Sequence, residues 1–470
     1  MKSDWLSPIL IKELRQGLRA RVFEGSFILL QVLMVLTLIG SLIAQTDRSP
    51  SPDDAAMLTG LFWTMVGIPV LLVMPLRGAG ALRGEIDGNT LELMFLTRLS
   101  SWRIVVGKWA ALFAQTCLLV CAVLPYIMLR YFLGAVELVM ELRIAFFMLA
   151  LSGLLMGLTV ALSAFRSRVM RGISYMTPFL LLWLGPAFYG ILFAMRSAGF
   201  ARGPGLGWMA AALVFGFIVL LYCFEVGAAR IGPAAENHET RKRLLGLLAL
   251  MLGIGAVLLG ADAEVHYFTF ALILPVCLDA LCRPWQRLPV LAVPFQRRGV
   301  VGRILGWLFL PGWPTGVFYT FFMFGAVALL WILSGLSTPD GGWTFFFAAL
   351  ALLLLPTAIM GNQVLRTEHL GATYIGVLMG LVCAGGTALA LLSLYAAFHP
   401  MVFDWIDTSF VLAASMLGAG LVASILFVRR GPFWREIVDV HAEAATLLRP
   451  REAAAALADD DSMGEGSPAG

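Results

Sequence analysis

Long apolar segments separated by short polar ones make up most of the chain. A helix needs about 20 mainly apolar residues to cross the hydrocarbon core of a bilayer, and stretches of that length recur in two series of six. The first series is Ser26–Gln45, Ala55–Leu76, Trp109–Leu129, Ile144–Phe165, Gly172–Met195 and Gly203–Phe224. The second series is Leu244–Ala261, His266–Cys282, Thr315–Leu336, Gly341–Leu365, Gly371–Phe398 and Thr408–Val428. The pattern predicts an all-α, polytopic transmembrane protein with about 12 transmembrane helices arranged 6+6.

The composition indicates that lipid surrounds most of the chain, and the distribution of basic residues predicts its orientation in the membrane. The 470 residues are 60% hydrophobic and 13% charged, whereas soluble domains are near half apolar and a quarter charged. Placing both termini in the cytoplasm puts all but five of the 33 Lys and Arg residues inside, which satisfies the positive-inside rule. The five exceptions are Arg48, Arg130, Arg143, Arg196 and Arg202. We therefore predict a multi-pass protein of the plasma (inner) membrane with cytoplasmic ends.

The segments outside the spans are short, so the predicted organisation follows the two series. The predicted parts are an amphipathic interfacial helix at 1–22, a first six-helix core at 23–228 with a cytoplasmic loop at 77–108, a linker at 229–243, a second six-helix half at 244–428 and a tail at 429–470. Within the tail, Trp434–Leu448 could form a surface helix, and the acidic end Asp459–Gly470 is typical of disorder.

Several kinds of site are disfavoured. The six cysteines and five histidines have no metal-ligand spacing beyond the isolated pair Cys117/Cys121, and no basic run with aromatics indicates nucleic acid. No P-loop sequence occurs, so ATP dependence would have to come from a partner. Serine, histidine and acidic residues do not cluster at one depth, so we predict no catalytic residues. A membrane-embedded lipid-modifying enzyme is the least favoured alternative.

The N-terminal segment before the first span has helical and amphipathic character. Ser7 is a good N-cap and Pro8 suits the first helical position. Apolar and basic residues then fall on different faces, with Leu10, Leu14 and Leu18 on one side and Lys12, Arg15 and Arg19 elsewhere. This pattern favours a helix lying in the membrane interface. The alternative is a simple positively charged flank of the first span.

The first long cytoplasmic loop, Arg77–Lys108, contains a second helical signal. Asn89 followed by Glu92 resembles a capping box, which predicts a short helix from about Thr90. That helix would be strongly apolar although it lies outside the spans, and Ser100 or Ser101 would then cap the third span. Such a surface has to be covered by headgroups or by a protein partner, and the residues alone leave both open.

The residues Glu85 to Lys108 follow the pattern Glu-x-x-Gly-x-Thr-Leu-Glu-Leu-x-x-x-Thr-x-Leu-Ser…Ile-x-x-Gly-Lys. This pattern resembles the loop between the second and third helices of type-2 ABC transporter permeases, the membrane-spanning subunits. The resemblance covers residues 5–228, and Arg98 stands where the family usually has proline. It implies a coupling helix that docks on a separate ABC ATPase, with ATP and Mg²⁺ bound by that partner and no cofactor bound by this chain. The implied contact residues are Glu85, Gly88, Asn89, Thr90, Leu91, Glu92, Leu93, Thr97, Leu99, Ser100 and Lys108. The run Lys12, Glu13, Leu14 and Arg15 likewise resembles the entry helix of the family.

The second half repeats the layout of the first without matching its residues. The basic loop Arg283–Pro314 follows its second span, as Arg77–Lys108 does in the first half, and ends in a Pro-Gly-Trp-Pro break. We expect a diverged repeat that lets one chain supply both membrane halves. The alternative is an unrelated extension, in which case two chains would pair as a homodimer.

Ionisable residues within spans are candidates for function. Arg130, Glu225 and Asp279 are the possible intramembrane polar groups, and Lys108 ends the third span. All four are near interfaces, which favours anchoring. Acidic pairs near the outer loops, such as Glu137/Glu141, are interpreted as a solvated face. Together these features favour the permease of an ATP-driven exporter. The alternative is a carrier driven by an ion gradient, with Asp279 and Glu225 as coupling groups.

Overall fold

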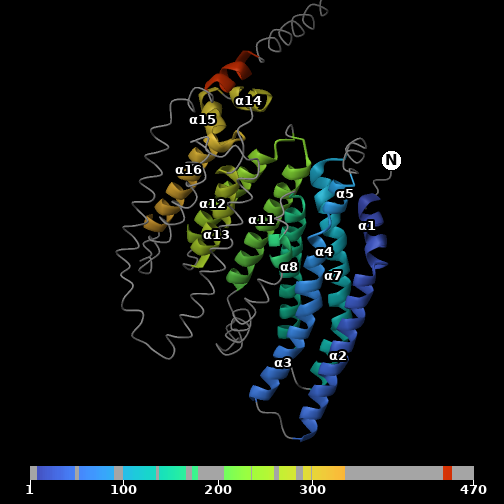
Figure 1. The fold of residues 1–470 in the computed structure, drawn as a ribbon. Helices are drawn as coiled ribbons and strands as arrows, with labels where there is room; N and C mark the ends of the chain where they lie inside the picture. The colour runs from blue at the N-terminus through green and yellow to red at the C-terminus, as the bar shows by residue number, and fades with distance from the viewer. Residues whose placement is uncertain are drawn as a thin grey trace, which may run out of the picture. The chain divides into compact units, whose positions relative to one another are not determined.

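The computed structural model describes residues 8–47, 52–88, 99–133, 137–165, 172–177, 206–233, 236–258, 264–281, 289–297, 299–333 and 438–446. Every regular element within these residues is a helix (Figure 1). The chain divides into two compact units, Met1–Glu236 and Asn237–Gly470.

The first unit is built from long helices that run alongside one another (Figure 1). Its helices are α1 (Pro8–Leu18), α2 (Arg21–Asp47), α3 (Pro52–Gly67), η1 (Ile68–Val73), α4 (Met74–Gly78), α5 (Arg83–Asp87), α7 (Ser101–Phe132), α8 (Leu138–Ser163) and α11 (Leu206–Ile231). The π-helical turn η1 begins one residue before Pro69, which has no N–H to donate to the regular helical pattern. The elements α3, η1 and α4 therefore continue one another as a single span with a local change of winding.

Five helical segments in the described residues are long and apolar enough to cross a membrane. They are Arg21–Gly40, Leu58–Asp87, Ser101–Phe132, Leu138–Ser163 and Leu213–Ile231, all in the first unit. Large apolar side chains stay exposed along them; on α2, Ile28, Leu36 and Ile43 are each about 60% exposed. A continuous apolar surface of this kind is unfavourable in water and favourable in the hydrocarbon of a bilayer. The protein is thus a helical multi-pass membrane protein, as the sequence predicted. The number of twelve spans and the cytoplasmic ends stay predictions.

Helix α7 is the central element of the first unit and packs against α1, α2, α8 and α11. The Trp109 ring stacks on Phe113 with centroids 5.0 Å apart and meets Phe224 edge-on at 5.1 Å. Its indole N–H donates to the Gly153 carbonyl oxygen at 2.8 Å. A Cβ on Gly153 would come within 2.9 Å of the Phe113 ring, so the absent side chain lets α8 approach α7 closely.

The second unit contains α12 (His238–Leu258), α13 (Glu264–Leu281), α14 (Pro289–Gln296), α15 (Gly299–Phe309) and α16 (Trp313–Leu333). Helix α13 packs against both α12 and α16. The predicted loop Arg283–Pro314 holds two short helices, α14 and α15, where the sequence indicated only a turn before the next span. The last three predicted spans, from Gly341 to Val428, lie outside the described residues.

The C-terminal segment 438–446, hereafter the tail helix, is coloured red in Figure 1. It falls inside the predicted surface helix Trp434–Leu448. Val440 and Ala444 are buried with Ala292 of α14 and with Leu310, which follows α15. One face of the tail helix is therefore part of the core of the second unit.

Candidate functional site

Lys108 of α7 binds two carboxylates from two other helices. Its Nζ lies 3.1 Å from Glu13 Oε1 of α1 and 2.9 Å from Glu85 Oε1 of α5. The Lys108 side chain is only 7% exposed, and a buried ammonium needs such partners because it has lost its hydration. These three residues, hereafter the Lys108 cluster, join α1, α5 and α7 at one point. The sequence had named each of them as a candidate without indicating that they meet.

Arg77 of α4 adds a second link between the same elements. Its guanidinium donates to Gln115 Oε1 of α7 at 2.5 Å and to the Gly17 carbonyl oxygen of α1 at 3.4 Å. Gly17 lies directly against the Gln115 side chain, where a Cβ would overlap it. A cavity of about 260 Å³ between these helices is lined by Glu13, Arg77, Lys108 and Gln115, among others. Helix α1 is therefore fixed along α7 by polar contacts, and its predicted position in the membrane interface stays a prediction.

The remaining residues of the predicted coupling loop flank the Lys108 cluster. Gly88 is the C-cap of α5, Leu99 packs partly buried against the core, and Ser100 is the N-cap of α7 without a side-chain cap hydrogen bond. On α1, Lys12 and Arg15 are exposed and Leu14 is partly buried. The predicted contact residues Asn89, Thr90, Leu91, Glu92, Leu93 and Thr97 lie outside the described residues.

Ser101 at the start of α7 makes a separate contact. Its hydroxyl donates to a carboxylate oxygen of Glu236, the last residue of the first unit. Gly232, just after α11, lies against the Ser101 side chain, and a Cβ on it would come within 2.7 Å of the Ser101 oxygen. The sequence assigned Ser101 only a possible capping role, and its partner is 135 residues further along the chain.

Arg130 lies at the opposite end of α7 from Lys108 and is also buried. Its guanidinium contacts Glu141 Oε2 of α8 at 3.1 Å and Thr59 Oγ1 of α3 at 2.9 Å, and it lies 4.3 Å over the Phe62 ring. The Arg130 and Glu141 side chains are 5% and 2% exposed. The interpretation of Glu141 as part of a solvated face is therefore wrong, because an arginine on the neighbouring helix covers it. Arg130 turns inward between three helices instead of reaching for the interface.

The two buried charges on α7 are separated by about the thickness of a membrane. An α-helix rises about 1.5 Å per residue, so Lys108 and Arg130 are roughly 33 Å apart along α7, close to the ~30 Å of a hydrocarbon core. Each charge binds carboxylate from other helices. The ion pairs of Lys108 and Arg130 thus lie where the two ends of α7 would meet the membrane–water interfaces.

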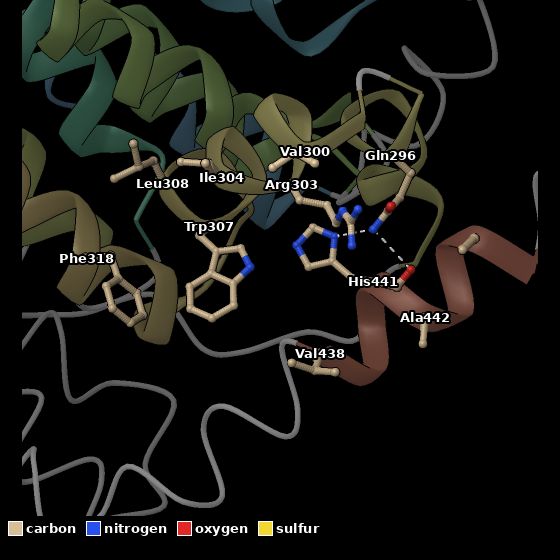
Figure 2. A pocket seen from close by; sticks show the side chains of 11 residues that line it. Gln296, Val300, Arg303, Ile304, Trp307, Leu308, Phe318, Val438, His441 and Ala442 are labelled. Atoms are coloured by element: carbon tan, nitrogen blue, oxygen red, sulfur yellow. Dashed lines mark hydrogen bonds between the residues drawn. The ribbon is translucent and has the colours of Figure 1, made fainter.

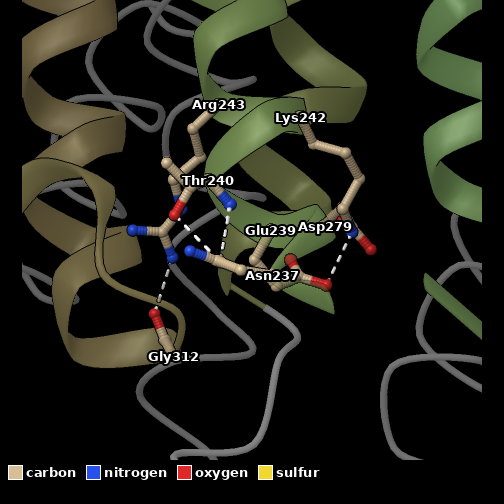
Figure 3. A network of polar contacts seen from close by, with 7 residues as sticks. All are labelled: Asn237, Glu239, Thr240, Lys242, Arg243, Asp279 and Gly312. Atoms are coloured by element: carbon tan, nitrogen blue, oxygen red, sulfur yellow. Dashed lines mark hydrogen bonds and ion pairs between the residues drawn. The ribbon is translucent and has the colours of Figure 1, made fainter. Parts of the chain in front are cut away.

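Asp279, predicted as a possible coupling group, is neutralised by a lysine. Its carboxylate pairs with Lys242 of α12, whose ammonium also lies 2.8 Å from Glu239 Oε1 (Figure 3). Lys242 is only 1% exposed. Glu225, the other predicted coupling group, is buried on α11. A carboxylate within a span favours a cation as its partner, and the basic run Arg241–Arg243 at the start of the preceding span was the signal that could have named Lys242.

Arg243 follows Lys242 and holds the break between α15 and α16. Its guanidinium donates to the Gly312 carbonyl oxygen at 2.8 Å (Figure 3). It also donates to the Leu308 carbonyl oxygen at 2.7 Å and to Thr315 Oγ1 at 3.0 Å. Tyr319 donates to the Arg243 carbonyl oxygen at 2.7 Å. The Leu308 carbonyl precedes the Pro311-Gly-Trp-Pro turn, and the Gly312 carbonyl lies within it. Sequence reasoning placed Arg243 in a linker, but α12 begins at His238 and includes it.

The tail helix is held to α14 by its histidine. Gln296 of α14 contacts His441 Nδ1 at 2.6 Å and donates to the His441 carbonyl oxygen at 3.2 Å. Burial, and secondly the positive charge of Arg303, lower the pKa of His441 from its ordinary value of 6.5. The docked imidazole is therefore held neutral more strongly than a free one.

Acid should release the tail helix. Above pH 6.5 the imidazole is neutral whether the helix is docked or free, so docking keeps its full strength. As the pH falls below this value, the free form takes up a proton before the docked form does, so docking weakens. Intrinsic amide exchange slows as the pH falls, so the exchange rates of residues 438–446 in non-ionic detergent are first corrected for this effect; the corrected rates should increase between pH 7.5 and pH 5.5. His441→Gln should remove this acceleration; an unchanged response in that variant would assign it to another group.

Within the described residues, no group of three or more His, Cys, Asp or Glu side chains could hold a metal ion. Compared with known proteins, the chain matches no family model, no curated protein and no solved structure.

Proposed function

We propose that this protein is the membrane permease of an ATP-driven exporter of the type-2 ABC class and works with a separate ATPase subunit. The observation that carries the proposal is the Lys108 cluster. Glu85 and Lys108 delimit the segment that resembles a coupling loop, and Lys108 pairs both with Glu85 and with Glu13 of α1. A push on residues 89–98 would therefore reach α5, α7 and α1 together.

The chain's own residues would transmit this push. Helix α7 runs from Ser101 to Phe132 with Pro125 inside its outer part, so a displacement at Lys108 would be carried along α7 at least as far as this proline. ATP and Mg²⁺, held by the partner, supply the free energy. The partner can drive the change only if it binds two conformations of this chain with different affinity. Glu85 and Lys108 act here as positioning residues and not as catalysts.

The pairing of Asp279 disfavours the ion-gradient alternative. A carboxylate that couples transport to a cation has to bind and release that cation. Asp279 is already paired with Lys242, which is buried and also contacts Glu239. Transport coupled through Asp279 would first have to break this ion pair.

Copurification from the native membrane tests the proposal. A tagged chain should bring down a P-loop ATPase, and Glu92→Arg should reduce the recovered ATPase about tenfold, the effect of losing ~1.4 kcal/mol of binding. Glu24→Arg, at an exposed position of α2, is the matched control and should recover the ATPase fully. Absence of any ATPase, together with transport that persists without ATP and stops with an ionophore, would overturn the exporter in favour of the carrier.

A further inference from the structure

A groove of about 890 Å³ lies between α15, α16 and the tail helix (Figure 2). Most of its wall is apolar, formed by Val300, Ile304, Trp307, Leu308, Phe318 and Val438. The Trp307 and Phe318 rings lie with their centroids 5.5 Å apart. The volume is in the range of sites that hold a sizeable small molecule.

The hydrogen bonds of His441 determine what its other ring nitrogen can do. A carbonyl oxygen only accepts, so the contact from Gln296 Nε2 to the His441 carbonyl fixes which end of the Gln296 amide faces the tail helix. The same amide nitrogen contacts His441 Nδ1 at 2.6 Å, so Nδ1 accepts. The proton of the neutral imidazole is then on Nε2. Nε2 is buried without a hydrogen-bond partner, in a residue that is 7% exposed and lines the groove.

Arg303 of α15 provides a positive charge at the same place. Figure 2 shows its guanidinium beside the His441 ring, and both residues line the groove. The Arg303 residue is exposed, so its charge is accessible. One N–H donor and one cation side by side match an anionic group rich in acceptors, because charge-assisted hydrogen bonds to phosphate or carboxylate are the strong ones.

The surroundings of the groove are those of a membrane surface. Val300, Val301 and Ile304 of α15 are each more than 60% exposed. The α15 segment is short and lies in a predicted cytoplasmic loop, so these side chains would enter the headgroup region instead of crossing the bilayer. A molecule that meets both the apolar wall and the Arg303/His441 pair has an anionic head and a hydrocarbon tail.

We propose that this groove binds an anionic phospholipid, with its phosphate at Arg303 and His441 Nε2–H and an acyl chain along Trp307 and Phe318. The bound lipid would join the tail helix to α15 and α16. This site is independent of the proposed transport function, since every residue in it belongs to the second unit.

Native mass spectrometry of the purified full-length protein tests the site. We expect phosphatidylglycerol, added to the protein in a non-ionic detergent, to bind more tightly than phosphatidylcholine does. Arg303→Gln should weaken this binding about tenfold, the loss of one charge-assisted contact. Ala442→Trp should weaken it comparably, because Ala442 is exposed and lines the groove, so the larger ring fills it.

Two controls distinguish the site from general membrane attraction. Arg297→Gln removes an exposed arginine of the same segment that does not line the groove, and it should bind as the parent protein does. Equal melting temperatures without lipid would show that the variants are folded. Unchanged binding in both Arg303→Gln and Ala442→Trp would overturn the proposal. So would oleate binding that equals phosphatidylglycerol and depends on Arg303, because the occupant would then be a free fatty acid.

Discussion

Replacing Lys108 by methionine should lower the free energy of unfolding by about 3 kcal/mol and, under the proposed function, uncouple transport from the partner ATPase. The substitution keeps the length of the side chain and removes its charge, so Glu13 and Glu85 are left facing each other without a cation. Breaking a buried ion pair costs ~3–5 kcal/mol. We expect the lower end because the Glu13 side chain keeps 23% of its surface exposed and water can reach it.

Thermal or denaturant unfolding of the detergent-solubilised protein measures the stability loss. Lys12→Met is the matched control, since Lys12 is exposed on α1 one residue before Glu13, and its effect should stay within about 0.5 kcal/mol. The triple variant Glu13→Gln, Glu85→Gln, Lys108→Met should regain much of the stability, because no unpaired charge is left.

The same variants separate stability from coupling. The triple variant should still recover the ATPase but should not regain ATP-dependent transport, because the neutral side chains no longer tie the loop to α1. A Lys108→Met protein as stable as Lys12→Met would contradict the buried ion pairs. A triple variant with full transport would contradict the transmitting role of the Lys108 cluster.

The long helices described in the first unit could be predicted from the sequence because apolar length is a local property, whereas residues 178–195 of the predicted fifth span lie outside the described residues. The six residues of α12 before the predicted span were missed for the same reason. A search for charge-free apolar stretches starts this span at Leu244, yet Lys242 and Arg243 before it are helical and buried. Lys242 is buried against the carboxylate of Asp279, and Arg243 against carbonyl oxygens in α15 and in the turn after it; these partners are 37 or more residues away in the sequence.

The candidate site likewise combines features that the local sequence predicts with contacts that it does not predict. The pattern around Glu85 and Lys108 could be recognised from local spacing, and Glu13 from its neighbours on α1. That the three meet at one ammonium depends on how α1 lies along α7, and no periodicity within either segment encodes it. Glu141 was misinterpreted because its sequence neighbours are those of a loop, while the group that pairs with it is on the preceding helix.

Breaking the Arg130–Glu141 pair from one side should be the most destabilising change at that end of the first unit. Glu141→Leu leaves the Arg130 charge buried among α3, α7 and α8, where Thr59 and the Phe62 ring remain its contacts. An arginine cannot escape by losing its proton, so we expect a loss of about 3–5 kcal/mol.

The double variant Arg130→Met, Glu141→Leu provides the decisive comparison. With both charges removed, the site becomes apolar, so the double variant should be more stable than Glu141→Leu alone. The double-mutant cycle should give a coupling energy of about 2–3 kcal/mol. Arg143→Met is the matched control, since Arg143 is exposed two residues beyond Glu141 on α8. Additive losses from the two single variants would mean that the charges do not interact, and Glu141 would again belong to a solvated face. A coupled pair would instead fix α7 and α8 to each other at this end, with Thr59 and the Phe62 ring linking α3 to the same guanidinium.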